Sequence, residues 1–368
     1  MGCIGSSAGG GANPTISRAR AAADADGGII MGNGDRFRKE LDPKDFMLVG
    51  RSGETVVRAP GSIHGQQFVI SDCTDCDILL CDHVEMVTID RCNDCRIFVG
   101  PCESSLFVRN CVGLKLVAAC RQFRTRDCER LDVLMHCVSQ PSIETSSAVR
   151  FGCYSFFYFA LPAQFEAARL SVFNNRWSEV YNFSPKHGAA TLLDGADASP
   201  PAFLKPGVSG LHDLAPFVTR EEADGWRDQS AVPSTLGAHA AAAGSTVLVC
   251  APALGTAGAL ELCARLAAAG LQLARTLEFE ADGKWRGALD SALARMPGGG
   301  GLGRIAPKAR VVVLQVAGAD SAARAAEVVD VFNAARGGAL ACAAADAASS
   351  AEMAAALFVQ EDAGHALG

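Results

Sequence analysis

The chain has 368 residues, of which 49% are hydrophobic, and this length is enough for about two domains with buried cores. Its formal net charge of −7 argues against a nucleic-acid-binding protein, which would carry an excess or a stripe of basic residues. The longest uncharged stretch, 229–260, is interrupted by prolines and a histidine, so we do not expect it to span a membrane.

The N-terminus matches the pattern for N-myristoylation, because Gly2 follows the initiator methionine and Ser6 occupies the favoured position. Cys3 is a site for S-acylation, and a second lipid is needed because one myristoyl chain binds a bilayer weakly. The segment lacks the basic and apolar regions of a signal peptide, so we expect reduced cysteines in a cytosolic, lipid-anchored protein. Residues 1–40 are rich in Gly and Ala and are expected to form a disordered tether.

Four copies of a short pattern follow, each built around a cysteine: Ser71-Asp72-Cys73, Asp90-Arg91-Cys92, Arg109-Asn110-Cys111 and Arg126-Asp127-Cys128. The cysteines are 19, 19 and 17 residues apart, and a period of this size is typical of stacked supersecondary units. Mostly hydrophobic residues recur three and five positions before and after each cysteine. Because side chains alternate across a strand, these columns face one way. The pattern predicts a right-handed parallel β-helix, a solenoid, over residues 41–185.

The first two copies also have the spacing of a four-thiolate zinc site, formed by Cys73 with Cys76 and Cys92 with Cys95. However, their separation equals the repeat period, and the next two copies have leucine in place of the second cysteine. A ladder of cysteines pointing into the core accounts for all four copies, whereas zinc accounts for two. We therefore expect buried thiols and no metal.

The aromatic-rich segment 151–183 is expected to close the end of the β-helix with a short helix at 163–168, and 186–243 is expected to be a linker. Beyond it, we expect strands at 247–250, 271–279 and 310–316 and helices at 256–269 and 319–335, with Thr256 as an N-cap. This alternation predicts an α/β domain of ferredoxin-like type over residues 244–368. The glycine run 298–301 is expected to be a mobile loop tip.

The fourth copy of the repeat differs from the others by its arginines. The alternation places Gln122, Arg124 and Arg126 on the outward face, where earlier copies have Val69, Thr88 and Phe107 in the column of Arg124. One interpretation is a solvated face on which Arg126 pairs with Asp90, and such surface pairs are weak. Another is an arginine supplied in trans to a small GTPase, where it stabilises charge that develops during GTP hydrolysis and is worth ~10³–10⁵ in rate.

The stretch 42–185 resembles the tubulin-binding cofactor C domain family, in its retinitis pigmentosa 2 branch. The matching segments are 65–68, 122–128, 140–144 and 173–178. The resemblance implies a GTPase-activating protein for an ARF-like small GTPase in its GTP state, with Arg124 as the arginine finger. It also implies that Gln122, Glu144 and Phe183 engage the GTPase or support the finger, and we group Arg126 with them.

Further expectations follow from the same resemblance. Glu144 would orient Arg124 through a charge-assisted hydrogen bond, and the partner GTPase would bind GTP and Mg²⁺, so the chain needs no cofactor of its own. Family members are acylated at the residues matching Gly2 and Cys3, although this chain lacks a cluster of Lys and Arg directly after that site. The implied role is release of lipidated cargo for the cilium or flagellum, at the cytoplasmic face of the plasma membrane and the ciliary base.

The C-terminal domain resembles, more faintly, the nucleoside diphosphate kinase-like domain of the same family. That chemistry needs a phosphorylatable histidine, and after residue 244 the only histidine is His365, so no kinase activity is expected. Two alternatives to a GTPase activator remain open: a non-catalytic GTPase-binding scaffold and a tubulin-folding cofactor. The acylation sites Gly2 and Cys3 argue against the tubulin cofactor, whose work is soluble.

Overall fold

The computed structural model describes residues 42–158, 160–188, 190–193, 198, 203, 230–241 and 244–358. The chain divides into two compact units, Met1–Leu48 and Val49–Gly368. At residues 42–49, a 3-10 turn η1, Pro43–Phe46, leads into strand β1, Met47–Val49. The expected lipidation sites Gly2 and Cys3 lie outside the described residues, as does His365.

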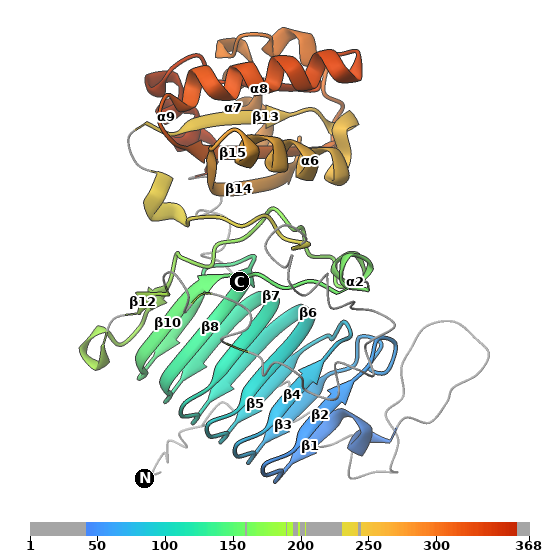
Figure 1. Ribbon diagram of the computed structural model, residues 1–368, viewed down its shortest axis with the longest axis vertical. Helices are drawn as coiled ribbons and strands as arrows, with labels where there is room; N and C mark the ends of the chain where they lie inside the picture. Colours follow the sequence, from blue (N-terminus) through green and yellow to red (C-terminus); the bar gives the residue numbers. More distant parts are fainter. Residues whose placement is uncertain are drawn as a thin grey trace, which may run out of the picture. The chain divides into compact units, whose positions relative to one another are not determined.

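The first half of the unit Val49–Gly368 is a stack of parallel strands in two series (Figure 1). The first series contains β3 Phe68–Ser71, β5 Val87–Asp90, the C-terminal halves of β6 Arg96–Arg109 and β7 Lys115–Arg126, then β9 Ser142–Glu144 and β11 Tyr181–Asn182. The second contains β2 Thr55–Arg58, β4 Asp77–Leu80, the N-terminal halves of β6 and β7, β8 Glu129–Cys137, β10 Ser147–Cys153 and β12 Thr191–Leu192. The predicted parallel β-helix is confirmed.

Polar residues beside each repeat cysteine form the corners between the two series. The residue before each cysteine has a left-handed φ of 52° to 56°: Asp72, Arg91, Asn110 and Asp127. The residue two positions after it has a φ of 48° to 71°: Asp75, Asp94, Gly113 and Arg130. Gly, Asn and Asp adopt this region at the lowest cost, which explains why they recur at these positions.

The structure contains two further turns of the same kind that the cysteine spacing did not predict. One precedes the first copy, where Gly50 and Gly53 have φ of 67° and 65°. The other follows the fourth copy, where Ser146 stands in the place of the cysteine and is 3% exposed. The Ser146 hydroxyl accepts a hydrogen bond from the backbone N–H of Cys128, as the Cys111 sulfur accepts one from the turn before it.

The repeat cysteines lie inside the β-helix as reduced thiols, with exposures of 0% to 3%: Cys73, Cys76, Cys92, Cys95, Cys111 and Cys128. In the described part of the chain, no group of three or more His, Cys, Asp or Glu residues is placed to hold a metal ion. Burial raises the pKa of the Cys73 thiol to about 11 and that of Cys95 to about 12, which favours the uncharged thiol.

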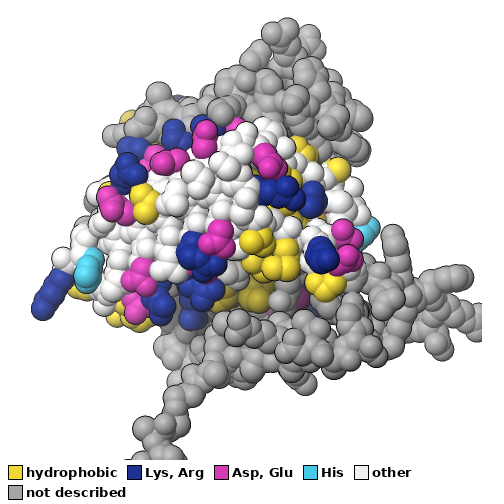
Figure 2. Space-filling model, turned by 90° about the horizontal axis from the view of Figure 1, so that it is seen from below, with side chains coloured by type: hydrophobic (Ala, Val, Ile, Leu, Met, Phe, Trp, Pro, Cys, Tyr) yellow, Lys and Arg dark blue, Asp and Glu magenta, His cyan; other side chains and the backbone are white. Residues whose placement is uncertain are grey.

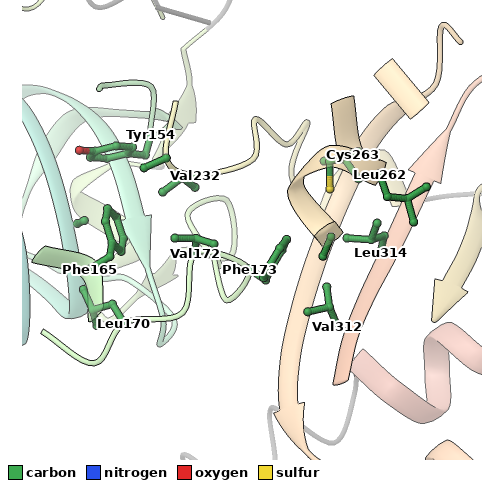
Figure 3. Packing of buried hydrophobic residues seen from close by; sticks show 14 of the residues in the cluster. Tyr154, Phe165, Leu170, Val172, Phe173, Val232, Leu262, Cys263, Val312 and Leu314 are labelled. Carbon is green, nitrogen blue, oxygen red and sulfur yellow. The ribbon is translucent and has the colours of Figure 1, made fainter. Parts of the chain in front are cut away.

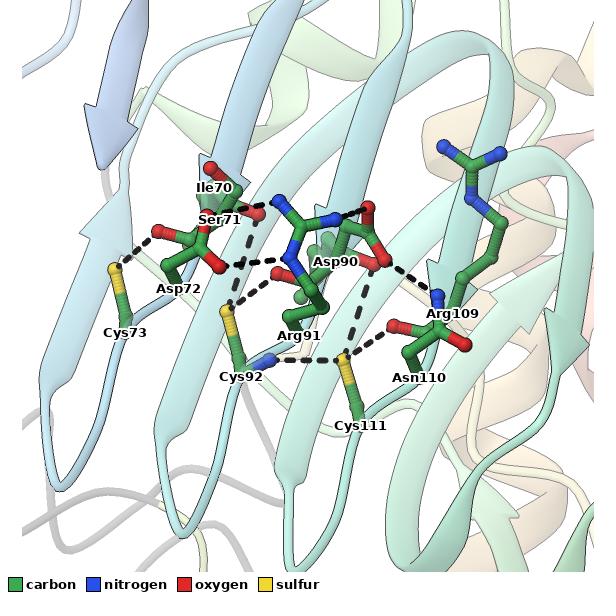
Figure 4. Close-up of polar contacts among 11 residues, drawn as sticks. Ile70, Ser71, Asp72, Cys73, Asp90, Arg91, Cys92, Arg109, Asn110 and Cys111 are labelled. Atoms are coloured by element: carbon green, nitrogen blue, oxygen red, sulfur yellow. Dashed lines mark hydrogen bonds and ion pairs between the residues drawn. The ribbon is translucent and has the colours of Figure 1, made fainter. Parts of the chain in front are cut away.

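An ion-pair ladder runs along the corners outside these thiols (Figure 4). Arg91 donates to the two carboxylate oxygens of Asp72 at 2.7 and 2.8 Å, and it also contacts the Asp90 carboxylate at 2.5 Å. Asn110 donates its side-chain amide to Asp90 at 2.8 Å. The ladder therefore joins three successive turns of the β-helix through charged and amide side chains.

The aromatic segment after β10 covers the outer face of the second series. Four central residues of the outward row of that series are at most 1% exposed: Leu79, Phe98, Val117 and Leu134. Phe98 stacks on Phe156 at 4.3 Å between ring centroids and meets Tyr158 edge-on at 5.8 Å. Helix α2, Leu161–Ala167, follows, and its Phe165 packs edge-on against Tyr154 (Figure 3). The segment expected to close the β-helix end thus covers one of its sheets.

Residues 244–358 contain a separate four-stranded sheet with antiparallel pairs in the order β14-β15-β13-β16. Its strands are β13 Thr246–Cys250, β14 Gln272–Glu280, β15 Arg310–Ala317 and β16 Ala341–Ala343. Its helices are α6 Gly255–Ala268, α7 Gly283–Arg295, α8 Ser321–Arg336 and α9 Ala347–Phe358. This strand order and the crossing helices confirm the predicted ferredoxin-like domain. No helix in the described ranges is long and apolar enough to cross a membrane.

Some elements of this domain were not predicted. Helices α7 and α9 and strand β16 were missed, because alanine-rich segments show little contrast between an apolar and a polar face. The predicted N-cap at Thr256 is wrong, since α6 begins at Gly255 with no side-chain cap. The glycine run forms a 3-10 helix, Gly299–Leu302, rather than an open loop tip. There Gly299 is buried, and a Cβ atom would lie 2.1 Å from the Leu293 carbonyl oxygen.

Candidate functional site

The outer face of the first strand series carries the predicted arginine. Strand register places its outward side chains in two neighbouring rows. One row consists of Val69, Thr88, Phe107, Arg124, Ser142 and Tyr181. The other consists of Ser71, Asp90, Arg109, Arg126 and Glu144. The outward column read from the sequence is therefore confirmed up to Arg124, and the structure extends it to β9 and β11.

Arg124 is exposed on a strand that is anchored from its other side. The flanking residues Phe123 and Thr125 are 1% and 3% exposed and point into the β-helix. Strand β7 also pairs with β6 on one side and with β9 on the other, so the backbone at Arg124 is held in a sheet interior. Within the described residues, the Arg124 guanidinium has no hydrogen-bond or ion-pair partner. Its five N–H donors are therefore available to a ligand or another protein.

Gln122 lies two residues before Arg124 and shares its outward face. The Ser105 hydroxyl of the preceding turn donates to its side-chain oxygen at 3.2 Å. This bond orients the Gln122 amide, so that its N–H₂ group points away from Ser105.

Arg126 and Glu144 are arranged differently from what the sequence suggested. Arg126 contacts Asp127 at 3.1 Å, not Asp90, and both partners are about half exposed. Glu144 is the register neighbour of Arg126, and it forms no hydrogen bond to Arg124 among the described contacts. The expected orienting bond is therefore absent from the described part of the chain, where Glu144 lies in the neighbouring row, diagonally from Arg124.

Arg109 occupies the second row between Asp90 and Arg126. Its side chain points away from the ion-pair ladder (Figure 4), and its Nε atom is buried without a hydrogen-bond partner. Two arginines of this face, Arg109 and Arg124, thus lack a partner within the described chain. Elsewhere the charges are mixed, and Figure 2 shows Lys and Arg lying beside Asp and Glu on the face seen from below.

Sequence reasoning identified Phe183 but missed Tyr181. Tyr181 is 51% exposed and Phe183 is 64% exposed, and their rings are nearly perpendicular with centroids 4.7 Å apart. The signal was available, because two aromatic residues two positions apart share one face of a strand. The sequence did not show that β11 pairs with β9 and so lies on the face of Arg124.

These contacts define a flat, open surface on which the Arg124 guanidinium, without a partner in the described ranges, is flanked by an amide, a carboxylate and two aromatic rings. A planar guanidinium makes paired hydrogen bonds to phosphate or carboxylate oxygens. A sheet surface of this kind suits contact with another macromolecule better than enclosure of a small molecule.

The tubulin binding cofactor C family profile matches residues 65–183, from just before β3 to the end of β11 and Phe183. The β-helix and its open face are thus those of a tubulin binding cofactor C domain protein. Protein XRP2 of Danio rerio is 50% identical over 151 residues, which are 41% of this chain and 40% of that protein. Protein XRP2 of Mus musculus is 40% identical over 249 residues, which are 66% of this chain and 69% of that protein. The chain belongs to the XRP2 family.

A more distant relative is Tubulin-specific chaperone C of Mus musculus, 25% identical over 122 residues, or 33% of this chain and 36% of that protein. The matched stretches span between 36% and 69% of these three relatives. The likeness of residues 244–368 to nucleoside diphosphate kinases stays a prediction, as do the roles of the individual site residues.

Proposed function

We propose that this chain is a GTPase-activating protein for an ARF-like small GTPase and that Arg124 is its arginine finger. The observation that carries the proposal is an exposed arginine, in the middle of a rigid sheet, that has no partner among the residues that the structure describes. Membership of the XRP2 family and the residues around Arg124 support it.

In this proposal the GTPase binds GTP and Mg²⁺ and positions the attacking water. Arg124 enters its active site and donates hydrogen bonds to the oxygens on which negative charge builds up between the β- and γ-phosphates. Gln122 and Glu144 contact the GTPase beside the finger, Arg126 stays close to Asp127, and Phe183 packs on the partner. The chain needs no cofactor, since the chemistry takes place on the partner's nucleotide.

Single-turnover hydrolysis of GTP by ARF-like GTPases tests the finger. We expect Arg124→Ala to lose acceleration by about 10³-fold or more while binding is kept, and Arg124→Lys to recover little because an ammonium cannot donate in the paired geometry. Arg51→Ala is the control, because Arg51 is a half-exposed arginine at an earlier turn whose ion pair is with Glu54. Full acceleration by Arg124→Ala would refute the assignment.

The two alternatives give different results in the same assay. A non-catalytic scaffold would bind the GTP state and leave hydrolysis unchanged or slower. A tubulin-folding cofactor would act on tubulin and leave ARF-like GTPases unaffected. The relation to Tubulin-specific chaperone C supports this second alternative.

The same proposal includes lipid anchoring at Gly2 and Cys3, at the cytoplasmic face of the plasma membrane and the base of the cilium or flagellum. There the activator would promote release of lipidated cargo by converting the GTPase to its GDP state.

A further inference from the structure

Two exposed aromatic side chains lie beside the proposed finger. Tyr181 and Phe183 are the exposed large aromatic residues of the described chain, at 51% and 64%. Tyrosine is enriched where proteins bind one another, because its ring supplies a large contact area at low cost in side-chain entropy. The perpendicular packing of the two rings, 4.7 Å between centroids, makes them one unit.

Hydrogen bonds to β9 and from the Asn182 side chain hold the backbone of this unit. Backbone N–H groups of Tyr181 and Phe183 donate to the carbonyls of Pro141 and Ile143 at 2.8 and 2.9 Å. Between them, the Asn182 side chain donates to the Gly188 carbonyl at 2.7 Å and accepts from the Ser184 N–H at 2.8 Å. A surface that is ordered before binding loses little conformational entropy when a partner docks.

Register gives the position of this unit relative to Arg124. Tyr181 pairs with Ser142, which pairs with Arg124, so two strand spacings of about 4.8 Å separate Tyr181 from the finger. A protein whose interface is of usual size and centred on Arg124 therefore also covers Tyr181.

Charge indicates which kind of partner fits. Arg124, without a partner in the described chain, offers donors to phosphate and carboxylate groups two strands away from the aromatic unit. A GTP-bound GTPase presents phosphates at its active site, and an apolar patch beside that site would complement the two rings. The second outer face of the β-helix is already covered by the aromatic segment after β10, as the burial of Phe98 shows.

We propose that Tyr181, together with Phe183, is an aromatic anchor that packs on an apolar patch beside the nucleotide of the same GTPase. Tyr181 determines the affinity for the GTPase, whereas Arg124 determines the rate of hydrolysis. This inference rests on the proposed function, and it assigns to Tyr181 a role in binding without a part in the chemistry.

The test separates affinity from rate in single-turnover hydrolysis with the full chain at increasing concentration over a GTP-loaded ARF-like GTPase. We expect Tyr181→Ala to raise the half-saturating concentration by about tenfold or more, with the maximal rate within about twofold of wild type. Tyr181→Phe, which keeps the ring, should behave as wild type. Arg124→Ala should show the opposite division, with a lost rate and a kept affinity.

Leu192→Ala is the matched control, because Leu192 is a 41% exposed apolar residue on β12 in the second series. The anchor would be overturned if Leu192→Ala lost as much affinity as Tyr181→Ala. It would also be overturned if Tyr181→Ala kept the half-saturating concentration of an active wild type. Either result would leave the proposed function standing. A wild-type chain that binds without accelerating would contradict the finger, and the Kd of Tyr181→Ala would then decide the anchor alone. No binding to any ARF-like GTPase would reject both.

Discussion

At the scale of single residues, the direction of a side chain on β7 decides its chemistry. Phe123 and Thr125 are buried in the β-helix, while Arg124 between them is exposed. This contrast follows from alternation along a strand, so the sequence predicted it. The pairings of the charged residues were not predictable, because each arginine has both sequence neighbours and cross-strand neighbours within reach. Arg126 contacts its sequence neighbour Asp127, and Glu144 lies beside Arg126 rather than Arg124.

One buried residue makes stability depend on pH. His136 is 0% exposed and packs edge-on against Phe165 at 5.5 Å. Burial lowers the pKa of His136 to about 3, against a smaller raising effect of the Ser171 backbone. Unfolded His136 titrates near its ordinary pKa of 6.5, so below that pH the unfolded chain binds a proton that the folded chain does not.

The contribution of His136 to stability is therefore complete above pH 6.5 and decreases as the pH falls towards 3. At about 1.4 kcal/mol per pH unit, we expect the free energy of unfolding to fall by about 2 kcal/mol between pH 6.5 and pH 5. Urea unfolding of wild type and His136→Leu at several pH values measures this change. The free energy of unfolding of the leucine variant should depend less on pH in this window. An equal pH dependence in both proteins would contradict the role given to His136.

At the scale of elements, the corners of the β-helix determine where strands end. Left-handed residues beside each cysteine turn the chain between the two series, and Gly113 occupies in one turn the position that Asp75 occupies in another. The cysteine spacing predicted four turns. It could not predict the turns at Gly50 or Ser146, because those turns keep the corner geometry without the cysteine.

Replacement of Asp75, which has a φ of 48° and is exposed, tests the role of a corner. We expect Asp75→Val to destabilise the chain by about 1–3 kcal/mol, because a β-branched residue is strained in the left-handed region. Asp75→Gly is the matched control and should be neutral within about 0.5 kcal/mol. Thermal unfolding compares the two variants, and equal melting temperatures would show that backbone strain at the corner is unimportant.

At the scale of the whole molecule, the proposed function needs an activator that is placed at a membrane and faces its GTPase. The net charge of −7 gives no general attraction to anionic lipid surfaces, so anchoring in this proposal depends on acyl chains. Because a single myristoyl chain binds weakly, Gly2 and Cys3 act together.

We therefore expect Gly2→Ala, which removes the myristoylation site, to move the protein from the membrane fraction to the soluble fraction, because stable anchoring needs two lipid signals. Cys3→Ser should leave weak, reversible binding through one chain. Fractionation of cells that express each variant, with Gly5→Ala as the control, gives the measurement. Membrane binding of Gly2→Ala equal to wild type would refute acyl anchoring.

The sequence by itself determined the repeat, the parallel β-helix, the ferredoxin-like domain and the outward direction of Arg124, because periodic burial depends on local alternation. Only the tertiary structure decided which residues share the face of Arg124. Tyr181 is 57 residues away from Arg124 in the chain, yet it joins the same row through Ser142. Such pairing depends on how whole turns stack, and the free energy of stacking is spread over many contacts that no short motif encodes.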